Sequence, residues 1–267
     1  MSADTEVENP DASMRYGSVS SQVADVFEPP EATDSLVLLL HGGFWDGSDR
    51  MRAWSAGHAL AEAGHLTAAV EYRRGKGRWQ DALDDVVHAI DQIQLSGREW
   101  TVHNEVPRCL TVVGHSAGGQ LALWAASRTS LPPTSRWHAK DIQVTGAVAM
   151  APLADLRRAA ELGIGDQAVV GFLGGTPEQV PDNYALTDPA LLTPSVPVRI
   201  LHGSDDDVVP VEISERYAAH LRHTGVADWD FTAVDGASHR SWGDPSSPSW
   251  PELISAIDRI SSVTPSA

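Results

Sequence analysis

The chain has 267 residues, and its 19 basic and 36 acidic side chains give a formal net charge of −17. This balance excludes nucleic acids and anionic membranes as expected partners, because both repel an acidic surface. The single cysteine, Cys109, excludes an internal disulfide framework. The acidic, polar N-terminus has no signal-like pattern, and the apolar runs are shorter than a membrane helix needs. We therefore expect a soluble, cytoplasmic protein.

Strand-like apolar runs alternate with segments of helical period along the chain. The expected strands are residues 22–27, 35–40, 66–72, 110–113, 142–150, 198–201 and 229–234. The expected helices are residues 52–63, 79–95, 117–127, 213–221 and 253–260. Such alternation predicts an α/β fold with a mainly parallel twisted sheet and helices on both faces. The first strand is expected to be an antiparallel edge strand.

The domain organisation follows from where this alternation holds and where it breaks. Residues 1–13 are expected to form a disordered tail, and residues 14–262 a single domain. Residues 153–192 interrupt the rhythm with a segment rich in Gly, Pro and Asp. Long insertions of this kind commonly cover active sites, so we interpret this one as a small cap.

A serine stands where the fourth expected strand turns into a helix. Residues 110–119 read LTVVGHSAGG, which places Ser116 in a G-x-S-x-G sequence. In this arrangement the serine occupies a strained turn with its hydroxyl at the carboxyl end of the strand, and the small neighbours avoid clashes. The positive end of the following helix favours negative charge beside Ser116. The alternative is a glycine-rich turn with an ordinary serine.

A second glycine-rich turn follows the strand at residues 35–40. It reads HGGFW over residues 41–45. Glycines here allow backbone N–H groups to turn toward a cavity, where they could stabilise an oxyanion. The predicted donors are the N–H groups of Gly43, Phe44 and Ala117. The alternative is a tight turn with aromatic residues that only pack.

A serine nucleophile needs a base and an acid that orients the base. Of the 11 histidines, His239 follows the last strand in the loop DGASHRSW. The loop HGSDDDVVP at 202–210 also follows a strand, and it offers Asp205, Asp206 and Asp207 as the acid. These carboxylates could instead form a solvated turn or a cation site. A metal site is not favoured, because no other ligands with suitable spacing accompany them.

Together these motifs resemble the α/β-hydrolase fold family of serine hydrolases over about residues 16–262. HGGFW is similar to the HGGxW sequence of kynurenine formamidases and related small esterases, and YGSVSSQVADVFEP is similar to their N-terminal hairpin. HGSDDDVVP is similar to the family pattern HGxxDxxVP. The resemblance implies that Ser116, Asp206 and His239 form a catalytic triad. Phe44 departs from the Tyr common in formamidases, and Gly119-Gln120 from their Ala-His.

We therefore expect a serine hydrolase that cleaves small acyl esters or aryl formamides through an acyl-enzyme intermediate, without a cofactor. Its expected partner is a small-molecule substrate, and the chain is expected to be a monomer or homodimer. The alternatives are a peptidase or acyltransferase with the same triad, and a non-catalytic binding protein on this fold. Trp45, Phe172 and Trp242 are predicted to line the substrate pocket, although they could equally be core residues.

Overall fold

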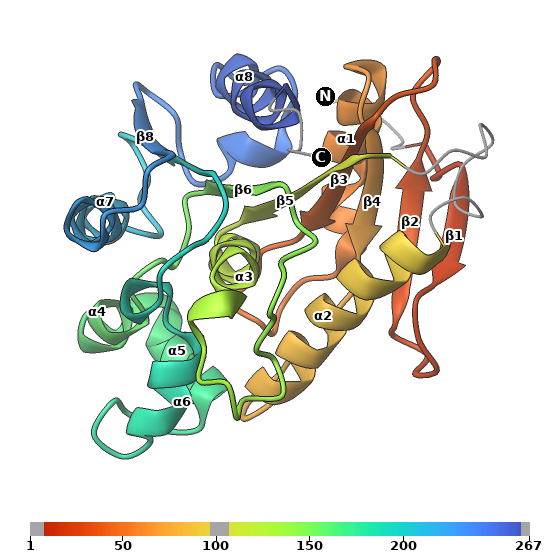
Figure 1. Ribbon diagram of the computed structural model, residues 1–267. Coiled ribbons are helices and arrows are strands. Elements are labelled where there is room, and N and C mark those ends of the chain that lie inside the picture. The colour runs from red at the N-terminus through yellow and green to blue at the C-terminus, as the bar shows by residue number, and fades with distance from the viewer. Residues whose placement is uncertain (1–7, 97–106, 263–267) are drawn as a thin grey trace.

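The computed structural model describes residues 8–96 and 107–262. Its centre is one eight-stranded sheet in the order β1-β2-β4-β3-β5-β6-β7-β8 (Figure 1). From β4 to β8 all neighbouring strands are parallel, whereas β1 and β2 form an antiparallel hairpin that joins the sheet through β4. The predicted α/β fold class is confirmed.

The strands and helices have the following bounds. The strands are β1 Ala12–Arg15, β2 Val23–Phe27, β3 Ser35–Leu40, β4 Leu66–Val70, β5 Cys109–His115, β6 Gly146–Met150, β7 Val198–Gly203 and β8 Trp229–Val234. The helices are α1 Trp54–Glu62, α2 Trp79–Ser96, α3 Ala117–Ala126, α4 Leu156–Glu161, α5 Ile164–Leu173, α6 Pro181–Thr187, α7 Glu212–Thr224 and α8 Trp250–Ser261. Short 3₁₀ turns include η1 Arg50–Ala53, η4 Pro189–Leu191 and η5 Ser241–Gly243.

Strand β3 shows why the sheet is covered on both faces. Its side chains alternate, so Leu36, Leu38 and Leu40 join one hydrophobic cluster while Val37 and Leu39 join the other. A strand buried on both faces needs a continuous apolar run, and residues 35–40 provide one.

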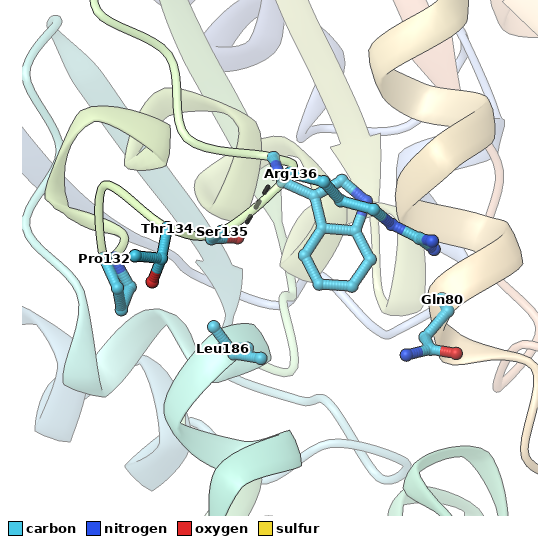
Figure 2. A pocket seen from close by; sticks show the side chains of 7 residues that line it. Gln80, Pro132, Thr134, Ser135, Arg136 and Leu186 are labelled. Atoms are coloured by element: carbon cyan, nitrogen blue, oxygen red, sulfur yellow. Dashed lines mark hydrogen bonds between the residues drawn. The ribbon is translucent and has the colours of Figure 1, made fainter.

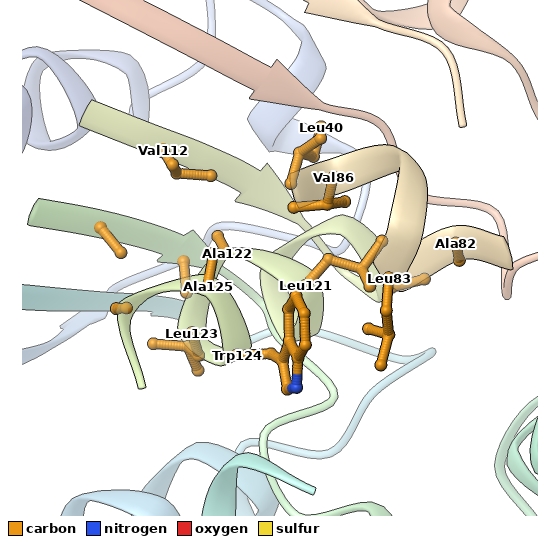
Figure 3. Packing of buried hydrophobic residues seen from close by; sticks show 14 of the residues in the cluster. Leu40, Ala82, Leu83, Val86, Val112, Leu121, Ala122, Leu123, Trp124 and Ala125 are labelled. Carbon is orange, nitrogen blue, oxygen red and sulfur yellow. The ribbon is translucent and has the colours of Figure 1, made fainter. Parts of the chain in front are cut away.

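Helices form a layer on each face of this sheet. The cluster with Val37 contains buried residues of α1 and α8, and the cluster with Leu36 contains buried residues of α2, α3 and α7. Figure 3 shows the second layer, where Leu121 and Trp124 of α3 lie near Leu83 and Val86 of α2. Within the described residues, no helix is long and apolar enough to span a membrane.

The predicted elements all occur, with differences in their bounds and at the N-terminal edge of the sheet. Strands β3 and β8 have the predicted bounds, whereas β6 starts only at Gly146. The strand at residues 22–27 is antiparallel as predicted, but β1 rather than β2 is the edge strand. The expected tail over residues 1–13 was therefore too long, because Ala12 and Ser13 pair with β2. Residues 1–7 lie outside the described part.

The segment between β6 and β7 contains α4, α5, α6 and η4. One buried carboxylate joins its two ends. Asp188 accepts backbone N–H groups of Leu156 (2.9 Å) and Arg157 (3.1 Å) at the start of α4, and that of Ala190 (3.1 Å). Burial raises the pKa of Asp188 to about 7. A lid role for this segment stays a prediction.

Candidate active site

The predicted site residues lie on loops that follow parallel strands. His41–Trp45 follows β3, Ser116 follows β5, Asp206 follows β7, and His239 follows β8. Strands β3, β5, β6, β7 and β8 are consecutive neighbours and parallel. Their carboxyl ends therefore meet at one edge of the sheet, the usual place for a site in an α/β fold.

Ser116 occupies a strained turn between β5 and α3. Its φ of 55° and ψ of −116° lie outside the regions that L-residues commonly adopt. The Ser116 N–H donates to the carbonyl of Met150 over 2.8 Å, which ties the turn to the neighbouring strand β6. The residue is only 2% exposed. This geometry is the sharp strand-to-helix turn that G-x-S-x-G predicts.

Two glycines allow the loop after β3 to lie against this turn. A Cβ on Gly118 would collide with the backbone carbonyls of Leu40 and His41, so only glycine fits this close approach. A Cβ built on Gly42 would lie 3.1 Å from the Cβ of Ser116. The HGGFW loop and Ser116 are therefore direct neighbours, as an oxyanion-binding role would require.

Asp206 and His239 are joined by a short hydrogen bond. The Nδ1 atom of His239 lies 2.7 Å from Oδ2 of Asp206, and the Asp206 side chain is fully buried. Asp205 and Asp207 are exposed. The structure thus distinguishes Asp206 among the three candidate acids. The rings of His239 and His115 are 4.6 Å apart, which brings His239 beside the residue that precedes Ser116.

The environment of Asp206 favours its ionised form. Its Oδ1 atom accepts the backbone N–H groups of Val208 (2.9 Å) and Val209 (2.8 Å). Burial alone raises the pKa of Asp206, but hydrogen bonds from His202, His239 and Val209 outweigh it and hold that pKa well below its ordinary value. A carboxylate that stays ionised can orient His239 and stabilise its protonated form.

The HGGFW loop has an unusual backbone. Gly43 has a φ of 112°, and a Cβ there would collide with Ser48. Phe44 and Trp45 follow with φ values of 52° and 54°, left-handed conformations that cost about 1 kcal/mol or more for each bulky residue. Strain of this kind persists only where the surrounding structure enforces it.

Hydrogen bonds to carbonyls fix two peptide groups of this loop, the one between Gly42 and Gly43 and the one between Gly43 and Phe44. The Gly42 carbonyl accepts from Nδ1 of His41 over 2.8 Å, and the Gly43 carbonyl accepts the N–H groups of Asp46 and Gly47, each over 3.0 Å. In a planar trans peptide the N–H points opposite to the carbonyl. The Gly43 and Phe44 N–H groups are therefore directed away from these partners, the orientation that free oxyanion donors need.

Aromatic packing connects this loop to the segment between β6 and β7. The rings of Trp45 and Phe172 of α5 stack at 4.5 Å with an interplanar angle of 6°. The Trp45 indole N–H donates to Gln120, which donates to the Thr187 carbonyl of α6. A Cβ on Gly165 would touch the Phe44 ring. Helix α5 thus lies over the predicted oxyanion loop.

The predicted pocket-lining aromatics are core residues in this structure. Trp45, Phe172 and Trp242 are 1%, 2% and 1% exposed. Trp242 packs in the hydrophobic cluster of α1 and α8, whereas Trp45 and Phe172 belong to the cluster on the other face. This burial agrees with the alternative that they are core residues, and the prediction that they line a substrate pocket stays a prediction. Phe44 of the same loop is only half-buried, and the exposed part of its ring could contact a substrate.

A buried ionic network behind the loop was not predicted. The Nε2 atom of His41 lies 3.3 Å from Glu71, whose carboxylate also pairs with Arg74 and accepts the N–H of Arg50. Burial raises the pKa of Glu71, but these partners, His41 first, bring it below its ordinary value. Because Nδ1 of His41 holds the Gly42 carbonyl, this network supports the loop. Nothing in the sequence around Glu71 pointed to it.

A surface cavity of about 430 Å³ lies elsewhere, between the loop at 132–137, the start of α2 and α6 (Figure 2). Gln80, Arg136, Trp137 and Leu186 are among its lining residues, and none of the predicted site residues is. Within the described residues, no cluster of three or more His, Cys, Asp or Glu could hold a metal ion.

Two relatives are similar to this chain in sequence over most of its length. The chain is 28% identical to a probable isoprenylcysteine alpha-carbonyl methylesterase of Oryza sativa subsp. japonica, over 85% of this chain and 57% of the relative. It is 25% identical to a kynurenine formamidase of Drosophila melanogaster, over 85% of this chain and 73% of the relative. The chain thus spans little more than half the length of the rice protein.

A solved structure has the same fold as this chain, and a family model matches most of its length. A truncated carbohydrate esterase from gut microbiota superimposes with a TM-score of 0.79 at 19% identity, covering 95% of this chain and 99% of that one, which shows a shared fold. The BD-FAE family model matches residues 24–221, from β2 to α7 and including Ser116 and Asp206. The chain therefore belongs to the BD-FAE family, a family of esterases with the α/β-hydrolase fold.

Proposed function

We propose that this chain is a serine hydrolase that cleaves small acyl esters or aryl formamides, with Ser116 as nucleophile, His239 as base and Asp206 as acid. The observation that carries the proposal is the 2.7 Å hydrogen bond between Asp206 and His239, beside a serine in a strained turn. The names of the relatives, a methylesterase and a formamidase, support the same two substrate classes.

The chemistry follows from these positions. Because Nδ1 of His239 is held by Asp206, Nε2 is the atom that takes the Ser116 hydroxyl proton as Oγ attacks the substrate carbonyl. The resulting oxyanion is stabilised by the N–H groups of Gly43, Phe44 and Ala117. His239 then returns the proton to the leaving oxygen or nitrogen, and the acyl–Ser116 ester forms. Water, deprotonated by His239, releases the acid and regenerates Ser116.

The loop and the cap favour a small acyl group. Phe44 packs against Gly165 of the cap, and Trp45 and Phe172 fill the space behind it. From this packing we infer that the acyl group beside the oxyanion donors is small, of formyl to butyryl size. We expect the leaving group to be larger, an aryl group or a larger alcohol.

Hydrolysis of p-nitrophenyl esters tests the proposal. Wild-type protein should cleave the acetate and butyrate, with kcat/KM at least about tenfold lower for the octanoate. Ser116→Ala should lose several orders of magnitude in kcat while staying folded by circular dichroism. Near wild-type turnover in folded Ser116→Ala would refute the assignment. N-formylkynurenine, assayed in parallel, distinguishes a formamidase from an esterase preference.

A further inference from the structure

A second histidine lies on the carboxylate of Asp206. The Nε2 atom of His202 is 3.3 Å from Oδ2 of Asp206, the same oxygen that binds His239. His202 is the last residue but one of β7 and is fully buried, and its Nε2 also lies 2.8 Å from the Val209 carbonyl. Its Nδ1 lies 2.7 Å from the hydroxyl of Ser214 on α7, which is buried as well.

These contacts assign the protons on the ring. Both neighbours of Nε2, the Val209 carbonyl and the Asp206 carboxylate, can only accept, so Nε2 carries a hydrogen. The Ser214 hydroxyl can then donate to Nδ1. A continuous series of polar contacts thus runs from Ser214 to His239: a hydrogen bond joins Ser214 to His202, a 3.3 Å ion-pair contact joins His202 to Asp206, and a hydrogen bond joins Asp206 to His239.

We propose that His202, held by Ser214, is a positioning residue: it holds the Asp206 carboxylate in place and lowers the basicity of that carboxylate. His202 thereby sets the pH range in which His239 serves as base. The inference rests on the proposed function, because it needs His239 to activate Ser116. His202 is not itself a catalytic residue, since it touches the acid rather than the reacting atoms.

The direction of the effect follows from the shared oxygen. The His202 Nε2–H, 3.3 Å from Oδ2, stabilises the negative charge on this oxygen and so makes it a weaker acceptor for the His239 N–H. Loss of the His202 donor therefore strengthens the bond to His239 and favours its protonated form, which cannot accept the serine proton. The other groups around this pair are His115 from β5, whose ring contacts His239, and the N–H groups of Val208 and Val209. A substitution of His202 leaves the residues that supply these groups unchanged.

The experiment follows the rate of covalent labelling by a fluorophosphonate between pH 5 and 9, with the labelled serine identified by mass spectrometry. The acid limb of the profile is the pH range in which the labelling rate rises as His239 loses its proton. In His202→Met this limb should move to higher pH by about half a unit or more. His202→Gln, whose amide N–H can still donate, should return the limb toward its wild-type position. Ser214→Ala should move it by less than His202→Met and remains informative if the latter fails to fold.

Thr111→Val is the matched control. Thr111 is fully buried on β5, and its hydroxyl has no hydrogen-bond partner among the described residues. The acid limb of the Thr111→Val variant should coincide with that of the wild type. An unmoved limb in folded His202→Met, or in Ser214→Ala if His202→Met does not fold, would overturn the inference and leave the proposed function standing. A wild-type protein that is not labelled at Ser116 would overturn both.

Discussion

The two halves of the candidate site are held by different forces. Asp206 and His239 are fixed by hydrogen bonds among buried titratable groups, with His202 behind them. In the loop from His41 to Trp45, the buried network of His41 and Glu71 holds the start, whereas the part from Gly43 to Trp45 is fixed by a left-handed backbone and by aromatic packing against the cap. The first half should respond to changes in charge and pH, and the second to changes in shape. Substitutions on each side can test this contrast.

The largest effect should come from the charge of the acid. Asp206→Asn keeps the size of the side chain but favours the wrong imidazole tautomer, which costs about 10⁴-fold in kcat in a serine protease. We expect a loss of that order on p-nitrophenyl acetate. Asp205→Asn, at an exposed neighbour, is the matched control and should stay close to wild type. A larger loss for Asp205→Asn would place the acid one residue earlier.

The shape of the loop should matter next. Gly43→Ala forces an alanine into a φ of 112° and against Ser48, so the adjacent N–H donors must move. Loss of one oxyanion donor typically lowers kcat by about 10²–10³-fold, and we expect a loss in this range. The pH profile should keep its wild-type acid limb, because the acid–base half is untouched. A shifted limb would show that the two halves are not independent.

A smaller effect should follow from loosening the cap. Phe172→Leu keeps an apolar side chain but removes the stacked pair with Trp45, a contact of about 1 kcal/mol. We expect a lower melting temperature and less than about a tenfold loss in kcat/KM. Leu191→Ala, at an exposed cap position, is the control for the segment. Equal effects of both variants would argue against a specific role for the stack.

A final effect concerns stability in acid. Burial, followed by the charge of His239, lowers the pKa of His115 to about 3. An unfolded histidine binds a proton below about pH 6.5, so the stability that His115 contributes is complete above that pH and falls as pH drops toward 3. His115→Asn should flatten the unfolding free energy between pH 6.5 and 4, by at most about 1.4 kcal/mol per pH unit. Urea unfolding at several pH values measures this, and an unchanged slope would contradict it.

The sequence predicted the elements that repeat a simple pattern. A short apolar run such as SLVLLL, followed directly by glycines, is typical of a buried strand, and a glycine-rich motif directly after a strand marks the functional edge of a parallel sheet. This reasoning located His41–Trp45, Ser116, Asp206 and His239 on one edge. The β1 strand was missed because ASMR is only four residues long, and so short an alternation of apolar and polar residues does not stand out from the polar N-terminus.

Other features depend on contacts between distant segments, which local patterns do not encode. Trp45 and Phe172 are both large and apolar, and only the fold shows that their rings stack on each other. Glu71 and Ser214 became part of the site because β4 and α7 pack behind it. His202 was visible in HGSDDDVVP, yet its contact with Asp206 depends on how the loop returns to β7.

The central claim is that His239, oriented by Asp206, activates Ser116. The most direct measurement is the rate and site of fluorophosphonate labelling at pH 8 in wild type, Ser116→Ala and His239→Ala. We predict one label per wild-type chain on Ser116, none there in Ser116→Ala, and labelling slowed by at least about 10²-fold in folded His239→Ala. A label on another serine, or an unchanged rate in His239→Ala, would contradict the account.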